Sequence, residues 1–231
     1  MKRVYKAVGV AEAGDGWEVR LDGRALRSPA KAPLVLPTRA MAEAVAAEWD
    51  AQADEVKPDT MPVMQLASTA VDRVGPQRAA IVDGVAAYAG SDLLCYRADH
   101  PRELAERQAR EWQPLLDWAA HRYDALLQAT SGIVHRAQPE DALKALRNAV
   151  DALDDWQLTG VQNATALAGS IIIALALYER RIDAGTAFEL SQLDETFQIE
   201  KWGEDAEAAK RRASLRADLE ATARFLSLLA P

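Results

Sequence analysis

The sequence predicts an α+β protein in which a small N-terminal β-rich subdomain is followed by a larger multihelical C-terminal domain. The first 37 residues alternate apolar and polar side chains, as strands do. From Thr38 onward, apolar residues recur at the three- and four-residue spacing of buried helix faces. Pro58 and Pro62 then interrupt the chain. We therefore expect a β-rich subdomain with one helix at residues 1–60 and a helical bundle domain at 61–231.

Two strands and a tight turn are expected at the start of the chain. Alternation is clearest in residues 4–10 and 17–21. Asp22 and Gly23 follow directly, and both residue types tolerate the positive φ angles of a two-residue type I′ hairpin turn. Three prolines surround residues 34–36, so this next strand should be limited to an edge or a short pairing.

The helices are marked by caps and by periodic apolar residues. Thr38 is the expected N-cap of the first helix. Further helices are predicted at residues 76–89, from 101 onward, at 139–153, one or two within 155–180, one from Asp183 to Gly203, and one over 204–229. Pro114 should kink or divide the helix that contains it, because its ring clashes with the preceding turn. Gly203 is expected to end its helix in a left-handed conformation.

The most apolar run, residues 164–178, is predicted to be a buried central helix. It is shorter than the roughly 20 residues that a membrane helix needs. Gly169 and Ser170 lie inside it and should permit close helix packing. Because no apolar signal-like stretch follows the first residues, we expect a cytoplasmic protein, or one of the mitochondrial matrix if the chain is a processed organellar form.

Composition argues against several classes of function. The 231 residues are 49% hydrophobic and 27% charged, which is typical of a globular protein, and the net charge of −8 disfavours a nucleic-acid partner. The single cysteine, Cys95, is predicted to be a small buried side chain. The three histidines stand too far apart in the sequence for a usual zinc motif. We therefore predict no catalytic residues, no metal and no cofactor.

Two segments at opposite ends of the chain are the most distinctive. Residues 21–34, LDGRALRSPAKAPL, combine a hairpin with a proline-marked extended stretch. Residues 198–205, QIEKWGED, place a tryptophan and a glycine between acidic stretches. Shorter matches lie between them at Glu48-Trp49 with Gln52, Met61-Pro62, residues 92–97, and Trp112 with Pro114-Leu115 and Trp118. In this order and spacing, the segments resemble the family of chaperones that hold the α subunit of the F-type ATP synthase before its catalytic head assembles.

The resemblance implies a function and a partner. It implies that the protein binds the unassembled α subunit, prevents its aggregation and yields it to the β subunit. It also implies a β-containing N-terminal part and a helical C-terminal part, which agrees with the periodicity. We expect a monomer that binds neither nucleic acid nor membrane.

The same resemblance points to the segment around Trp202 as the partner-binding site. In that family an acidic residue near the Trp-Gly pair is implicated in chaperone function. The expected partner-binding residues are Glu200, Trp202, Gly203, Glu204, Asp205 and Glu207. The Trp202 ring could fill the core between two helices, or anchor an interface, because tryptophan is enriched among binding hot spots, and both roles can hold at once if one ring edge is buried.

Two other functions remain open at this point. One is a small carboxylate-dependent hydrolase that uses acids of the helical domain, for which the candidates are Asp194, Glu195, Glu200, Glu204 and Asp205. It predicts a deep pocket with convergent carboxyl groups of shifted pKa, whereas a chaperone predicts a shallow apolar and acidic patch. The other is a structural helical protein with some different partner.

Overall fold

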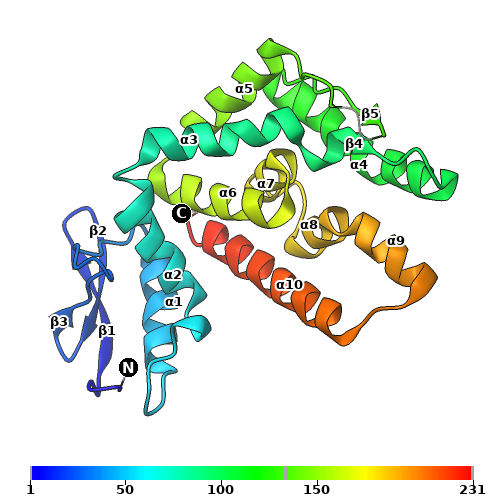
Figure 1. Cartoon of the computed structure of the whole chain (residues 1–231). Helices are drawn as coiled ribbons and strands as arrows, with labels where there is room; N and C mark the ends of the chain where they lie inside the picture. Colours follow the sequence, from blue (N-terminus) through cyan, green and yellow to red (C-terminus); the bar gives the residue numbers. More distant parts are fainter. Residues whose placement is uncertain (1, 133–134, 230–231) are drawn as a thin grey trace. The chain divides into compact units, whose positions relative to one another are not determined.

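The computed structural model describes residues 2–132 and 135–229 and confirms the α+β class (Figure 1). The chain forms two compact units. Unit 1 comprises Met1–Arg78, Asp155–Gly160 and Ala221–Pro231, and unit 2 comprises Ala79–Asp154 and Val161–Glu220. Three helices, α3 (Arg78–Ala87), α6 (Asp155–Ala168) and α10 (Ala206–Ser227), therefore contribute residues to both units.

Unit 1 opens with the expected antiparallel sheet, of strand order β1-β2-β3. Strands β1 (Val8–Ala13) and β2 (Gly16–Leu21) pair along their whole lengths, and β2 pairs with the short β3 (Arg24–Ala25). Asp22 and Gly23 form the turn between β2 and β3 with φ angles of 49° and 80°. The predicted two-residue turn with positive φ is thus confirmed.

The segment at residues 33–36 makes only isolated bridges to its neighbours. Trp17 and Leu36 exchange two backbone hydrogen bonds of 2.9 and 2.7 Å, and Arg27 bridges to Pro33. This short pairing matches the limit that the prolines impose.

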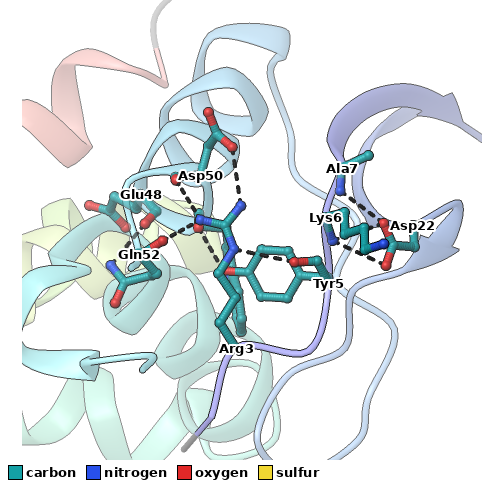
Figure 2. A network of polar contacts seen from close by, with 9 residues as sticks. Arg3, Tyr5, Lys6, Ala7, Asp22, Glu48, Asp50 and Gln52 are labelled. Carbon is teal, nitrogen blue, oxygen red and sulfur yellow. Dashed lines mark hydrogen bonds and ion pairs between the residues drawn. The ribbon is translucent and has the colours of Figure 1, made fainter. Parts of the chain in front are cut away.

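The N-terminal residues are fastened to the first helix and to the hairpin turn (Figure 2). The Arg3 guanidinium donates to the carbonyl oxygens of Asp50, at 2.9 Å, and Gln52. The Tyr5 hydroxyl donates to the Trp49 carbonyl at 2.6 Å. Asp22 accepts backbone hydrogen bonds from Lys6 and Ala7, which holds the pKa of its carboxyl group below the usual value.

Helix α1 (Arg39–Asp50) begins at the predicted cap, since the Thr38 hydroxyl accepts from the Met41 N–H at 3.1 Å. Its successor α2 (Pro62–Thr69) is capped by a side chain of α1. The buried Glu48 carboxylate accepts from the N–H groups of Val63 and Met64 at 2.9 and 2.8 Å. Burial raises the pKa of Glu48 despite these hydrogen bonds. A 3-10 turn, Pro58–Thr60, precedes α2, and a π-helical stretch, Ala70–Val74, follows it.

The core of unit 1 draws on both ends of the chain. Its buried cluster combines sheet, α1 and α2 residues with Phe225, which is fully buried. The Thr38 hydroxyl also donates to the Leu228 carbonyl at 2.5 Å. The predicted domain division at residues 60 and 61 stays a prediction. The two compact units do not follow that division of the sequence, because α2 and residues 221–229 belong to the same unit as the sheet.

Unit 2 is built mainly from helices. They are α3 (Arg78–Ala87), α4 (Arg102–Tyr123), α5 (Glu140–Asp151), α7 (Ile171–Tyr178), α8 (Ala184–Ser191) and α9 (Leu193–Trp202), together with its parts of α6 and α10 and the 3-10 turns Tyr88–Ser91 and Leu93–Cys95. Helix α7 is the predicted central helix, with every residue from Ile171 to Leu177 buried. Trp112 of α4 is also fully buried, and its indole N–H donates to the Leu190 carbonyl at 3.0 Å.

A buried carboxylate organises the start of α7. Asp92 is 0% exposed and accepts from the Leu94 N–H, the Ser170 hydroxyl and the Ile172 N–H at 3.0, 2.8 and 3.2 Å. Burial nonetheless raises the pKa of Asp92 to about 6, because desolvation outweighs the hydrogen bonds. Asp92 therefore links the loop before Leu93 to the N-terminus of α7.

The structure decides several expectations for the helical region. Of the two outcomes expected at Pro114, a kink or a division, the division is wrong, since α4 continues as one helix from Arg102 to Tyr123. Gly169 and Ser170 do not lie within a continuous helix; Gly169, with φ 67°, ends α6, and Ser170 caps α7.

The predicted helix between Asp183 and Gly203 is two helices, because the backbone of Gln192 leaves the helical region between α8 and α9. Asp183 does cap α8, accepting from the Thr186 N–H at 2.7 Å. The region also contains an unexpected parallel pair of short strands, β4 (Tyr96–Arg97) and β5 (Thr130–Ser131).

Candidate partner-binding surface

The six predicted partner-binding residues lie together where α9 ends and α10 begins, in unit 2. We call this the Trp202 surface; it consists of Glu200, Trp202, Gly203, Glu204, Asp205 and Glu207. Trp202 is the last residue of α9, and 76% of it is exposed. Of the two interpretations of this ring, core filler and surface anchor, the first is wrong. A largely exposed tryptophan is unusual, because its apolar area contacts water until a partner covers it.

Gly203 explains why the chain turns away directly after Trp202. Its φ and ψ are 84° and 171°, a region that is essentially restricted to glycine. The expectation of positive φ is confirmed, but the conformation is extended rather than left-handed helical. Because the chain leaves the helix in this way, α10 does not continue over the Trp202 ring.

Asp205 has a structural task as well as a place on the surface. Its Oδ1 accepts from the N–H groups of Glu207 and Ala208 at 2.9 and 3.0 Å, at the start of α10. These hydrogen bonds, of which the one from Ala208 has the larger effect, hold the pKa of the Asp205 carboxyl group below the usual value. Asp205 is therefore the N-terminal cap of α10.

The glutamates of the Trp202 surface each have a basic partner in unit 2. Glu200 accepts two hydrogen bonds from Arg107 of α4, at 3.0 and 2.8 Å. Glu204 pairs with Arg212 at 3.2 Å, and Glu207 lies 3.9 Å from Arg211. The side chains of Glu204 and Arg212 are half-buried, whereas the Glu207–Arg211 pair is exposed, and an exposed pair contributes about 0–1 kcal/mol, so a partner protein can exchange it at little cost.

Sequence reasoning missed a polar groove that adjoins this surface. The groove has a volume of about 640 Å³ and lies between α4 and the helices α8 and α9. Four glutamates, at positions 103, 106, 111 and 189, line it together with Arg107 and Arg110. Arg107 belongs to both regions, because it lines the groove and binds Glu200. The charges of α4 were visible in the sequence, but their neighbours on α8 and α9 lie about 80 to 90 positions further along.

Comparisons with known proteins identify the family. The family described as ATP12 chaperone protein matches residues 2–120. The crystal structure of Atp12 from Paracoccus denitrificans is 42% identical, with a TM-score of 0.95 over 99% of this chain and 98% of that one. A solved Agrobacterium tumefaciens protein is 41% identical, with a TM-score of 0.95 over 99% of this chain and 86% of that one. The mitochondrial protein atp12 of Schizosaccharomyces pombe is 24% identical over 202 residues, 81% of this chain and 69% of that protein.

This chain belongs to the ATP12 chaperone family. The resemblance stated from the sequence is thereby confirmed, and so is the class of function, a chaperone. The family match ends at residue 120, before the Trp202 surface. The likeness to the Paracoccus Atp12 structure covers 99% of this chain and extends over the whole helical region.

The hydrolase alternative gains no support from the geometry of this ATP12 chaperone. Its signature is a pocket with convergent carboxyl groups of shifted pKa. Burial raises the pKa of Glu48, Asp92 and Asp194, but none of the three lines the polar groove beside α4. Each is instead bound to its own structural partners, such as Gln108, which donates to Asp194 at 2.6 Å.

Other chemistry expected to be absent can be checked only within residues 2–132 and 135–229. Among these, no three histidine, cysteine or acidic side chains come together in a way that could bind a metal ion. None of the helices in the same residues is both long and apolar enough to span a membrane. Cys95 is buried as predicted, and burial raises the pKa of its thiol to about 12, which keeps it protonated and unreactive.

Proposed function

We propose that this ATP12 chaperone binds the unassembled α subunit of the F-type ATP synthase and that the Trp202 surface contacts this client. The observation that carries the proposal is the 76% exposure of Trp202 at the end of α9, with acidic side chains around it. A large aromatic side chain encircled by polar groups is the usual composition of an interface hot spot. The resemblance to the α-subunit chaperones supplies the identity of the client.

The physical reason for such a chaperone lies in the client. A subunit made for a ring exposes apolar surface that its neighbour will cover, and uncovered surfaces of this kind aggregate. The chaperone must therefore bind well enough to protect the surface and weakly enough to be replaced. One exposed tryptophan with exchangeable ion pairs fits this moderate affinity, and the β subunit is the proposed competitor.

The action requires no chemistry. We propose that the protein works by binding alone, as a monomer, with neither catalysis nor cofactor. The proposed location is the bacterial cytoplasm, or the mitochondrial matrix for an organellar form; the Schizosaccharomyces pombe relative is described as mitochondrial.

The test follows aggregation of the purified α subunit by light scattering after dilution from denaturant. Wild-type chaperone should suppress the scattering, and Trp202→Ala should suppress it much less. Leu126→Ala is the matched control, since Leu126 is 68% exposed in the same unit but lies outside the Trp202 surface. Addition of the β subunit should then displace the chaperone from α in gel filtration. Equal suppression by the Trp202 and Leu126 variants would remove Trp202 from the interface, and no suppression by wild type would refute the proposed function.

A further inference from the structure

Unit 1 carries an apolar groove that neither the family membership nor the Trp202 surface explains. Its volume is about 730 Å³. The floor is formed by Trp49 of α1, by Val56 and Pro58 from the following loop and turn, and by Met61 and Met64 at the start of α2. All of these residues lie in unit 1.

The floor belongs to the hydrophobic core itself. Trp49, Val56, Met61 and Met64 are 8, 6, 2 and 7% exposed and are members of the buried cluster of unit 1. A segment that entered the groove would therefore contact core side chains directly. The two methionines suit such a role, because their flexible thioethers adapt to differently shaped apolar partners.

Trp49 also has a polar group that the fold leaves unused. Its indole Nε1 is buried and has no hydrogen-bond partner in the described part of the chain. The hydrogen bond from Tyr5 engages the Trp49 carbonyl and not the indole. Buried donors are nearly always paired, so this unpaired N–H marks Trp49 as an unusual residue of the groove floor.

The rim of the groove is positively charged. Arg27 and Arg73 are both exposed at its edge. Arg27 donates to the Lys31 carbonyl at 2.9 Å, and the side chain of Arg73 makes no hydrogen bond or ion pair with any residue that the structure describes.

The acid on this rim forms no ion pair with either arginine. Asp72 uses one carboxylate oxygen for the Ser28 hydroxyl, at 2.5 Å, and the other for the Ala30 N–H, at 3.0 Å. The groove therefore offers an apolar floor and two guanidinium groups available for anions.

We propose that this groove binds an apolar segment of the client that carries at least one carboxylate. The apolar side chains would cover Met61 and Met64, and the carboxylate would lie between Arg27 and Arg73, where guanidinium groups bind carboxylates well. The inference rests on the proposed function, in that the segment belongs to the unassembled α subunit. It gives the chaperone a second contact, in unit 1, separate from the Trp202 surface in unit 2.

The experiment measures binding of the full-length chaperone to immobilised, purified α subunit by interferometry at low and at physiological salt. The groove variant is Arg27→Glu with Arg73→Glu. Its matched control is Arg20→Glu with Arg24→Glu, two exposed arginines of β2 and β3 that change the charge equally without lining the groove. We expect about tenfold weaker binding and slower association for the groove variant, with the difference reduced at higher salt. The control should stay within about twofold of wild type.

The possible results separate the two proposals. If wild type binds the α subunit and the groove variant binds equally well, the inference is overturned and the proposed function stands. If wild type itself does not bind, both are overturned. Thermal melting of each variant checks that the exposed substitutions leave the fold intact.

A second measurement identifies the segment. Overlapping synthetic 15-residue peptides that span the α subunit are probed with wild type and with the groove variant. Peptides that bind wild type should be apolar with at least one Asp or Glu, and they should lose binding to the groove variant or when the acid is replaced by its amide. Binding peptides without acids, or equal binding by both proteins, would contradict the inference.

Discussion

Two carboxylates of unit 2, Asp92 and Asp205, perform the same local task in opposite surroundings. Both accept backbone N–H groups at the start of a helix, α7 in one case and α10 in the other. Yet the pKa of Asp92 is raised to about 6, and that of Asp205 is lowered. The difference is solvent: Asp92 is 0% exposed, so desolvation dominates, whereas Asp205 remains in water and only the hydrogen bonds count.

The comparison shows which acidic side chains can contact a partner protein without loss of stability. An acid in the position of Asp92 is committed to the fold, because its removal strands several buried donors. The glutamates of the Trp202 surface form ion pairs that a partner can exchange, whereas Asp205 of the same surface also caps α10. Substitutions in the two regions should therefore separate stability from binding.

The largest effect is expected for Asp92→Ala. It leaves the N–H groups of Leu94 and Ile172 and the Ser170 hydroxyl without their acceptor in the interior. Each stranded donor costs about 1–3 kcal/mol, so the free energy of unfolding should fall by about 3 kcal/mol or more. Urea denaturation followed by circular dichroism measures this. A loss below about 1 kcal/mol would mean that water replaces the carboxylate.

Trp202→Ala should lower the affinity for the α subunit and leave the stability of the fold almost unchanged. Because the ring is 76% exposed, the free energy of unfolding should change by no more than about 0.5 kcal/mol. Affinity for the α subunit should fall by about 2 kcal/mol, which is about thirtyfold, if the ring is a hot spot. Calorimetric unfolding and titration of the α subunit give the two numbers. A large loss of stability with unchanged binding would reverse the roles assigned to the two regions.

A smaller, pH-dependent effect is expected from Asp92→Asn. The folded protein binds a proton at Asp92 as the pH falls through about 6, while the unfolded chain does so only near 3.8. Protonation therefore favours the folded state, and wild type should gain about 1 kcal/mol relative to Asp92→Asn between pH 7.5 and pH 5. Parallel urea titrations of both proteins test this. A constant difference across that range would show that Asp92 does not titrate there.

The smallest effect is expected at Asp205. Asp205→Asn keeps an oxygen to cap α10, so Tm should stay near that of wild type, while Asp205→Lys removes the cap and should lower Tm. The lowered pKa of Asp205 means that its contribution is fully present above pH 3.8 and is lost as the pH falls through the folded-state value. Melting curves at pH 7 and in acid compare the variants. Charge reversal around Trp202 is thus better tested at Glu204 and Glu207, which do not cap the helix.

The fold was largely predictable from the sequence because its signals are local. The turn at Asp22-Gly23 and the caps at Thr38 and Asp183 depend on residues within a few positions of each other, and all three are confirmed. The errors concern features without periodicity. A two-residue strand such as β4 has no alternation to detect, and the break at Gln192 has neither Gly nor Pro to mark it.

The candidate site was predictable in place but not in its contacts. The sequence brought the six residues together because they are neighbours in the chain. It left the exposure of Trp202 open, since a tryptophan beside a glycine suits a core as well as a surface. It also missed the partner of Glu200, because Arg107 lies 93 positions away. Such pairs depend on tertiary packing, which no local pattern records.

The assembly of unit 1 from distant segments has a consequence for biosynthesis. The sheet and α1 leave the ribosome long before Phe225, which completes their core and lies far along the chain. Leu226 packs over Gly160, where a Cβ atom would lie 2.3 Å from the leucine, so this closure also needs a bare backbone on α6. During translation the apolar face of the sheet and α1 therefore stays uncovered until Phe225 has been synthesised. A member of the ATP12 chaperone family thus exposes apolar surface of its own until the helix that carries Phe225 is released.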